Sequence, residues 1–363
     1  MNHFSKSGAK GKLLCLTLLL SASLVPQLSH AGCWLPVGNR MATLLKTIPT
    51  RQVSVLAHRG LWGGYSGDAT LPENSRGSLQ KADDECMDAV ELDVKMTREG
   101  VPVLMHDYNL GRTTDVYNAF RGGHKYNPMN NRGTNPSVAS LSWETIQFLH
   151  LLTPDRNRVT GYYVPDISGV FSYWNQHGMR TPMIFDTKTQ DAVRAIDRLA
   201  QENFSRPSDV VGVKVNATLY PSYNSFRADA PTIRVIPVFT TNMLTKINVS
   251  AVESGWQARS PAVEINVKQR NGLLQGQLNN AKRARLAVGA FNALPDAPGQ
   301  NEFYKNTGQC CYRLSDLYFS YWGGRDTADN RGDWNFLVSE GFTFITTDNP
   351  QGLIGFLRSK GLH

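Results

Sequence analysis

Short apolar runs rich in β-branched residues recur along the 363-residue chain. Between most of them lie helix-compatible stretches such as 191–204 and 271–284, so the pattern predicts strands that alternate with helices. Such alternation is typical of a parallel sheet. The candidate strands are 53–58, 89–94, 101–107, 182–188, 210–216, 233–239, 261–267, 285–291 and 342–348.

The spacing between the second and third runs leaves eight parallel strands. Only six residues separate Val94 from Val101, whereas a parallel crossover needs about a dozen or more. We therefore expect 101–107 to turn back as a hairpin. The remaining strands predict an α/β fold, a (β/α)8 TIM barrel with a hairpin insertion after the second strand. An open doubly wound sheet is the alternative, weakened because no glycine-rich phosphate-binding turn follows the first strand.

Polar residues gather at the carboxyl ends of these runs, where barrels of this kind build their active sites. Polar groups at the ends of apolar strands are costly unless they serve one another or a ligand, so they predict a site. Two segments, 108–180 and 293–341, are too long for simple connections and predict long loops near this face. The strand-end residues are His58, Arg59, Glu91, Asp93, Asp186, Lys188, Lys214, Asn266, Asn292 and Asp348.

The spacing of the acidic residues favours a metal. Glu91 and Asp93 are two positions apart on one strand, so both side chains face the barrel mouth. Hard divalent cations choose such carboxylate oxygens. Asp186 and Lys188 repeat the spacing on another strand, which makes Asp186 a third candidate ligand and Lys188 a candidate phosphate contact. A buried ion-pair network is the structural alternative, but two pairs beside two histidines favour one divalent metal, Ca²⁺ or Mg²⁺.

Two histidines complete this set. His58 ends the first strand, and His106 ends the return arm of the hairpin, which brings it beside Glu91 and Asp93. A histidine accepts and donates protons near neutral pH. The pair therefore predicts one acid and one base, without fixing which histidine is which.

The chain resembles the glycerophosphodiester phosphodiesterases through motifs that occur in the family's order. The resemblance implies a (β/α)8 barrel with a hairpin-like insertion, one divalent metal, and cleavage of a phosphodiester whose alcohol is a small headgroup. The motifs are AHRG (57–60), LPENS (71–75), ELDV (91–94), PVLMHD (102–107), GRTT (111–114), VPDISGVFSYW (164–174), FDTK (185–188) and TTDNP (346–350).

The resemblance also implies a role for each motif residue. It implies that His58 and His106 are the acid–base pair and that Arg59 and Lys188 contact the phosphate. It also implies that Glu91, Asp93 and Asp186 bind the metal and that Glu73 helps to order the site.

The chain departs from the family pattern at three places. Asp186 stands where the family commonly has glutamate, a feature reminiscent of related sphingomyelinase D-like barrels. The stretch 61–70 is longer than usual. Gly289 or Phe291 replaces a tryptophan on the penultimate strand, so Trp62 or Trp322 could supply an aromatic wall instead.

The first residues predict a signal peptide. Three lysines precede a short apolar stretch, and Ser29-His30-Ala31 is a small-x-small cleavage signal. We expect a signal peptide at 1–31, an extension at 32–52, a catalytic barrel at 53–363, and export to the periplasm or beyond the cell. A lipid anchor at Cys33 is less favoured, because the residues SHAG before it lack the expected aliphatic residue.

Charge and cysteines limit the remaining possibilities. Removing 1–31 takes away three lysines and no acidic residue, so the formal net charge falls from +8 to +5. Without a basic run or interleaved aromatics, nothing suggests a nucleic-acid groove. Cys33, Cys86, Cys310 and Cys311 permit disulfides in an exported chain, in any of three pairings. The adjacency of Cys310 and Cys311 favours bonds to other cysteines over a bond to each other.

The expected function is that of an exported metal-dependent phosphodiesterase that hydrolyses glycerophosphodiesters to an alcohol and glycerol phosphate. One alternative is a sphingomyelinase D or phospholipase-type enzyme acting on membrane lipids, which an exposed apolar rim near 310–336 would favour. Another is a non-catalytic binding protein, disfavoured because a competent residue fills each core position. The expected partner is a small phosphodiester or lysolipid-like substrate. Peripheral membrane contact and the oligomeric state stay open.

Overall fold

The computed structural model describes residues 35–46, 52–257, 259–299, 301–313 and 328–363. Its eight parallel strands close into a barrel, because β1 pairs in parallel with both β2 and β13. This confirms the predicted (β/α)8 TIM barrel and excludes the open sheet. In spatial order the strands are β1 (Ser54–His58), β2 (Ala89–Met96), β6 (Met183–Thr187), β7 (Val211–Asn216), β8 (Arg234–Phe239), β9 (Ala262–Ile265), β10 (Ala287–Phe291) and β13 (Phe344–Thr347).

The ninth apolar run forms the predicted hairpin arm. Strand β3 (Pro102–Leu104) pairs antiparallel with β2, with Val94 opposite Leu104. Gly100 lies in the turn at φ 86°, a left-handed conformation that glycine adopts without the steric cost of a side chain. The hairpin therefore returns the chain to the carboxyl end of β2.

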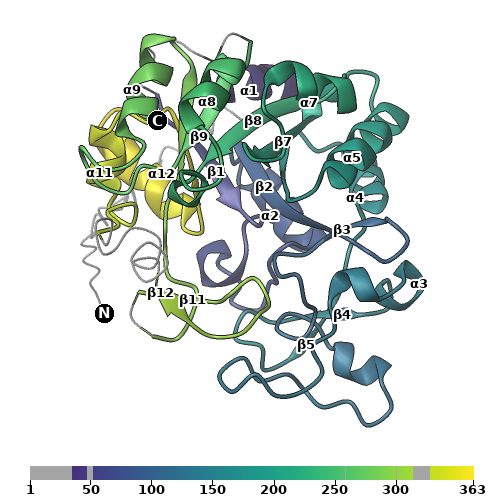
Figure 1. Ribbon diagram of the computed structural model, residues 1–363. Helices are drawn as coiled ribbons and strands as arrows, with labels where there is room; N and C mark the ends of the chain where they lie inside the picture. The colour runs from purple at the N-terminus through teal and green to yellow at the C-terminus, as the bar shows by residue number, and fades with distance from the viewer. Residues whose placement is uncertain (1–34, 47–51, 258, 300, 314–327) are drawn as a thin grey trace, which may run out of the picture.

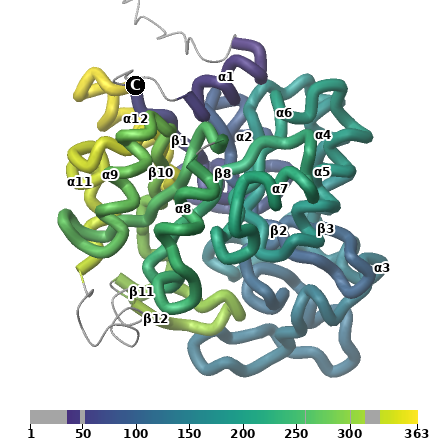
Figure 2. The backbone as a smooth tube through the Cα atoms, turned by 45° about the horizontal axis from the view of Figure 1, so that its top comes forward, coloured from purple at the N-terminus to yellow at the C-terminus, as the bar shows by residue number. Residues whose placement is uncertain are grey.

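Successive side chains of each strand point to opposite faces, one toward the outer helices and the other toward the barrel interior. Ala57 faces the core beneath the outer helices, whereas its neighbour Leu56 points into the barrel. The inward positions are apolar near the amino end, where Met41 and Leu44 of α1 (Val37–Leu44) pack against them. Helix α1 lies at the end of the barrel opposite to β11 (Glu302–Phe303) and β12 (Tyr312–Arg313) (Figure 2). The polar side chains that point into the barrel therefore lie at the carboxyl ends of the strands.

Helices surround the barrel (Figure 1). The predicted helix 191–204 is α5, which begins after Thr189 accepts a hydrogen bond from Ala192 N–H and buries Val193, Ile196 and Ala200 on one face. Among the described helices, none has the length and apolar character needed to cross a bilayer. The outer helices are α2 (Arg76–Asp84), α4 (Ile167–Gln176), α5 (Gln190–Asn203), α6 (Pro207–Val210), α7 (Tyr223–Asp229), α8 (Val249–Gln257), α9 (Gln275–Arg283), α11 (Trp334–Ser339) and α12 (Pro350–Ser359).

The two long loops lie together beyond the carboxyl end of the barrel (Figure 1). The loop after β3 has a small apolar core of its own that includes Leu110, Val138 and Ile146. We call residues 108–165 the insertion. The other loop holds the β11–β12 hairpin. The elements of the insertion are η3 (Val116–Ala119), η4 (Val138–Ser140), α3 (Trp143–Ile146), β4 (His150–Leu152) and β5 (Val159–Tyr163).

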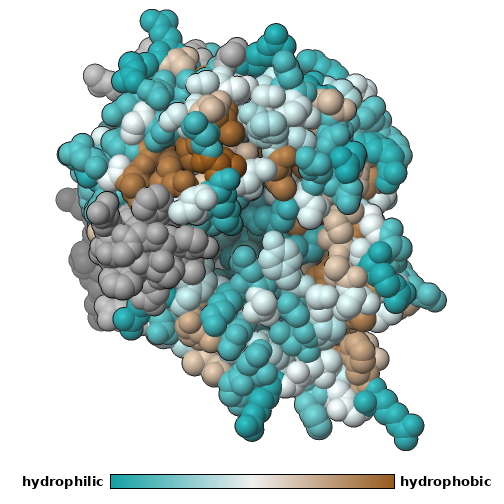
Figure 3. Space-filling model, viewed as in Figure 1, coloured by the Kyte–Doolittle hydropathy of each residue, from teal (hydrophilic) through white to brown (hydrophobic). Residues whose placement is uncertain are grey.

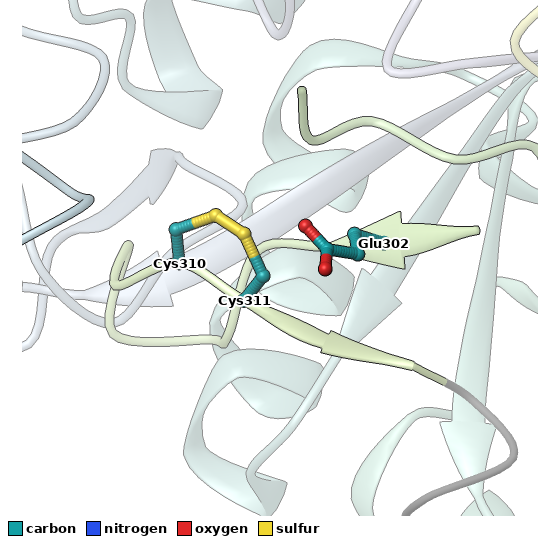
Figure 4. Close-up of side chains that lie close together, drawn as sticks. All are labelled: Glu302, Cys310 and Cys311. Atoms are coloured by element: carbon teal, nitrogen blue, oxygen red, sulfur yellow. A yellow bond between two sulfur atoms is a disulfide. The ribbon is translucent and has the colours of Figure 1, made fainter. Parts of the chain in front are cut away.

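Cys310 and Cys311 form a disulfide with each other, with Glu302 close beside them (Figure 4). The prediction that they would bond to other cysteines is wrong. Cys86 precedes β2 and lies at the amino end of the barrel, whereas Cys310 donates its N–H to the carbonyl of Pro128 in the insertion. The barrel separates the two positions. Cys86 is also disulfide-bonded, and Cys33 lies outside the described residues.

Candidate active site

The carboxyl ends of the strands open into a cavity of about 310 Å³. Figure 3 shows the molecule hollowed near the centre of this face, with hydrophilic residues around the hollow. The structure brings together all but one of the predicted site residues in the lining, and the remaining one, Glu73, lies behind Arg59. The predicted residues that line the cavity are His58, Arg59, Glu91, Asp93, His106, Asp186 and Lys188.

His58 is held at the mouth by a buried carboxylate. Its Nδ1 lies 2.8 Å from Oδ1 of Asp348, and its Nε2 lies 3.8 Å from Oε2 of Glu91. The ring packs edge-on against Phe291, with 4.9 Å between the centroids. Burial has the largest effect and lowers the pKa of His58, but the carboxylates of Asp348 and Glu91 together bring the pKa above its usual value. With Nδ1 engaged, Nε2 is the nitrogen that faces Glu91.

His106 is anchored in the same way from the other side of the cavity. The N–H of Met105 donates to the carbonyl of Asp93 at 3.0 Å, which places the following residue beside that strand. The Nδ1 of His106 lies 2.7 Å from Oδ1 of Asp107. Arg112 holds this carboxylate with two hydrogen bonds of 2.6 and 3.0 Å. Burial opposes the charge of Asp107, but Arg112 and His106 keep its pKa well below its usual range.

Glu91 and Asp93 form a buried acidic pair between the histidines. One donor atom each from His58, Glu91 and Asp93 lie within 4.8 Å of one another. Burial and the neighbouring Asp93 raise the pKa of Glu91 to about 7. Burial also opposes the charge of Asp93, but His106 and Arg59 keep its pKa well below its usual range. The pair offers the oxygen donors that a hard divalent cation prefers.

Arg59 lies at the cavity wall with its guanidinium surrounded by acids. Its Nη1 lies 3.1 Å from Oε2 of Glu73 and 3.6 Å from Oδ2 of Asp296. Its Nε lies 3.6 Å from Oδ2 of Asp93 and has no hydrogen-bond partner among the described residues. Glu73 also accepts a hydrogen bond of 3.2 Å from Arg112. Glu73 therefore joins the arginine near the first histidine to the arginine that orders the second.

The residue after Glu73 links the same segment to the acidic pair. Asn74 donates to Oδ2 of Asp93 at 3.1 Å and accepts a hydrogen bond of 2.9 Å from the Asp93 N–H. Ser75 then caps α2. The PENS motif therefore has two roles: it begins helix α2, and it positions the carboxylate of Asp93.

Asp186 lies beside Asp93 in the strand register, and Lys214 follows on the next strand. The Asp186 carboxylate is ion-paired with Lys188. The metal-ligand role of Asp186 and the phosphate-contact role of Lys188 therefore stay predictions. Although burial opposes the charge of Lys188, Asp186 holds its pKa above the usual value.

A second buried pair closes the floor of the cavity. The Nζ of Lys214 lies 2.7 Å from Oε2 of Glu264 and 2.7 Å from the hydroxyl of Thr346. Asn266 donates to the other oxygen of Glu264 at 2.9 Å. The sequence predicted Lys214 and Asn266 as polar residues at strand ends. Glu264 was missed, although it lies two positions before Asn266 on the same predicted strand, a spacing that places both side chains on one face.

Sequence reasoning assigned no role to four residues that shape the site. Asp107, Arg112 and Asp348 lie inside the motifs PVLMHD, GRTT and TTDNP, so the motifs themselves held that signal. Asp296 lies in a long loop, where no pattern of the sequence places it beside Arg59.

The structure places two of the aromatic residues that were candidates for a wall of the site. Phe291 lines the cavity, whereas Trp62 is outside the lining and donates its indole N–H to the carbonyl of His58 at 3.0 Å. Trp322 lies outside the described residues. Asn292 is outside the lining and donates its amide N–H to the carbonyl of Arg331 at 2.6 Å.

Comparison with known proteins identifies the family. The model of the glycerophosphoryl diester phosphodiesterase family matches residues 58–298. Glycerophosphodiester phosphodiesterase 1 of Rattus norvegicus is 43% identical over 81 residues, which is 22% of this chain and 22% of that relative.

Solved structures agree in fold. A glycerophosphoryl diester phosphodiesterase from Parabacteroides distasonis has a TM-score of 0.56 at 15% identity, with 90% of this chain and 93% of that chain covered. A phosphodiesterase from Oleispira antarctica, solved with the product sn-glycerol-3-phosphate, has a TM-score of 0.52 at 17% identity, with 85% and 97% covered. The predicted family resemblance is confirmed, and the chain belongs to the glycerophosphoryl diester phosphodiesterase family.

Proposed function

We propose that this protein is a divalent-metal-dependent glycerophosphodiester phosphodiesterase that releases an alcohol and glycerol phosphate, with His58 and His106 as its proton-transfer pair. The observation that carries the proposal is the matched anchoring of the two rings. Nδ1 of His58 contacts Asp348 at 2.8 Å, and Nδ1 of His106 contacts Asp107 at 2.7 Å. A carboxylate at one ring nitrogen fixes the tautomer and leaves the other nitrogen for chemistry.

In this proposal one histidine removes a proton from the attacking hydroxyl, and the other gives a proton to the oxygen of the departing alcohol. The attacking hydroxyl belongs either to water or to the glycerol itself. Attack by the glycerol hydroxyl gives a cyclic phosphate, whereas attack by water gives glycerol phosphate directly. The two routes differ in product mass, which makes them separable.

Arg59 and Lys188 are the proposed phosphate contacts. The planar guanidinium of arginine suits two oxygens at once, while lysine supplies a point charge. Both lie at the cavity lining, and Arg59 Nε has no hydrogen-bond partner among the described residues. The guanidinium and the ammonium thus bring positive charge to the lining beside the acidic pair, where an anionic phosphate would be attracted.

Glu91 and Asp93 are the proposed core of the metal site, with Asp186 as the third ligand. Two buried carboxylates whose oxygens lie close together fit a hard divalent cation. A bound cation would neutralise negative charge on the phosphate oxygens. His58 belongs to the same cluster, but its hydrogen bond to Asp348 favours its use for proton transfer.

The direct test is a substrate panel with product masses. Purified protein is given glycerophosphocholine, glycerophosphoethanolamine, a lysophospholipid and sphingomyelin, each with Mg²⁺, with Ca²⁺ and with EDTA. The proposal predicts release of the free alcohol from the first two substrates, together with glycerol phosphate or its cyclic form, and no turnover in EDTA. Hydrolysis confined to sphingomyelin, or full activity in EDTA, would overturn it.

We also propose export. Residues 1–31 have the composition of a signal peptide, and the disulfide between Cys310 and Cys311 fits an oxidising compartment. Expression in a bacterial host followed by fractionation tests this. Recovery of the uncleaved chain in the cytoplasm alone would contradict export.

A further inference from the structure

A second, smaller groove adjoins the active-site cavity. It encloses about 150 Å³, against about 310 Å³ for the cavity. Lys95, Tyr108 and Lys188 line both spaces, so the groove and the cavity are neighbours that share these three side chains as a wall. The remaining residues of the groove are Val94, Met96, Ser137, Val138, Ala139 and Thr189.

The groove is apolar along most of its length. Val94 of β2 and Val138 of η4 are buried at its wall, and Met96 follows on the same strand. The Lys95 ammonium donates to the carbonyl of Met105 at 3.1 Å and lies 5.2 Å from the centroid of the Tyr108 ring. Its charge is therefore engaged within the protein, and its methylene stem can line the groove as amphipathic side chains do.

The positive charge of Lys188 adjoins the apolar surface of the groove. Lys188, a proposed phosphate contact, lies at the junction of the cavity and the groove. Tyr108 and Val138 both line the groove, so an ester substituent that entered it from a phosphate at this lysine would lie against them. An apolar cavity of about 150 Å³ is large enough for a benzene-sized group, which corresponds to a short alkyl segment.

We propose that this groove binds an apolar segment of the substrate's alcohol, so that phosphodiesters with an alkyl alcohol are preferred over those with a small polar one. This inference rests on the proposed function and names the substrate class of the same site. The apolar chain is part of the substrate, and its phosphate is held at the lysine junction.

The test is a homologous series of glycerophosphoalkanols with methyl, butyl, hexyl and decyl groups, with glycerophosphoglycerol as the polar reference. Burial of one methylene corresponds to about a fourfold change in an equilibrium or in kcat/KM. The proposal predicts that kcat/KM rises by up to about fourfold per carbon over the first four to six carbons and then levels off, because the groove is filled.

A matched pair of variants locates the effect. Ala139 lines the groove and is exposed, so Ala139→Trp fills the groove from its rim. Ala119 is an exposed alanine at the end of η3 in the same insertion and is outside the groove lining. Ala139→Trp is expected to flatten the dependence of kcat/KM on chain length, whereas Ala119→Trp is expected to keep the wild-type slope.

The outcomes separate this inference from the proposed function. Turnover of the whole series with no dependence on chain length, or an unchanged slope in Ala139→Trp, would overturn the groove and leave the function intact. If none of the glycerophosphodiesters is hydrolysed, the proposed function fails. Titration calorimetry with methyl and hexyl phosphate then still decides the groove. Tighter binding of hexyl phosphate, lost in Ala139→Trp, supports it, and equal binding overturns it.

Discussion

The Nδ1 atom of His58 lies 2.8 Å from Oδ1 of Asp348, although the two residues come from the first and the last strand ends of the barrel. Barrel closure brings them together, because β1 and β13 are neighbours in the sheet. The contact fixes which ring nitrogen faces the acidic pair. It makes Asp348 a positioning residue for the proposed proton transfer.

Asp348→Asn is expected to lower kcat by about 10²- to 10⁴-fold with a small change in KM. The amide keeps the size of the side chain but removes the charge that raises the pKa of His58. The limb of the pH–rate profile that reports this histidine should therefore move to lower pH. Asp84→Asn, at an exposed position on α2, is the control. An unmoved profile in Asp348→Asn would refute the positioning role.

The same pair predicts how stability depends on pH. The folded-state pKa of His58 is raised, so its contribution is present below the unfolded pKa near 6.5 and is lost as the pH rises through the folded value. The folded-state pKa of Asp348 is lowered, so its contribution is lost as the pH falls through that value. Asp348→Asn should therefore reduce the free energy of unfolding more at pH 5.5 than at pH 8.5. Urea unfolding at the two pH values measures this, and a larger loss at pH 8.5 would contradict the assignment.

Glu91→Gln is expected to have opposite effects on stability without and with metal. Burial and Asp93 raise the folded-state pKa of Glu91 to about 7, so the wild type loses stability as the pH rises from about 4.5 to 7. In EDTA at pH 8 the variant should be more stable, by on the order of 1–3 kcal/mol. With Mg²⁺ or Ca²⁺ the wild type should gain stability that the variant lacks. Equal metal-induced shifts of the melting temperature in both proteins would argue against the metal site.

Arg112→Ala is expected to cost about 3–5 kcal/mol of folding free energy, because it leaves the buried Asp107 carboxylate without its cation. Arg112→Lys should recover part of the stability, since lysine cannot reproduce the two parallel hydrogen bonds. Arg121→Ala, at an exposed position in the same insertion, controls for loss of positive charge. Urea unfolding checks the order of the four proteins, and a stable Arg112→Ala would mean that Asp107 is not buried as a charge.

The barrel itself was predictable because its pattern is local. Each parallel strand is a continuous apolar run, and the six residues between Val94 and Val101 are too few for a crossover. The hairpin and the end-of-strand positions of His58, Glu91 and Asp186 follow from the same reasoning. Periodicity and the length of the connecting segments are enough to predict these features.

The partners of these residues were not predictable in the same way. Asp348 reaches His58, and Glu264 reaches Lys214, only after the barrel closes, and no spacing rule links such distant positions. The short strands of the insertion carry little periodicity. The prediction that Cys310 and Cys311 bond to other cysteines was wrong, because the sequence does not show that Cys86 lies at the opposite end of the barrel.

The measurement that tests the central claim most directly is the initial rate of glycerophosphocholine hydrolysis by wild type, His58→Ala and His106→Ala at saturating metal, with circular dichroism confirming that each variant is folded. If both histidines transfer protons, each variant should lose about 10²- to 10⁴-fold in kcat, and the double variant should lose less than the product of the two. A folded variant of either histidine that keeps its rate within about tenfold of wild type, below the range expected for such a group, would contradict the claim.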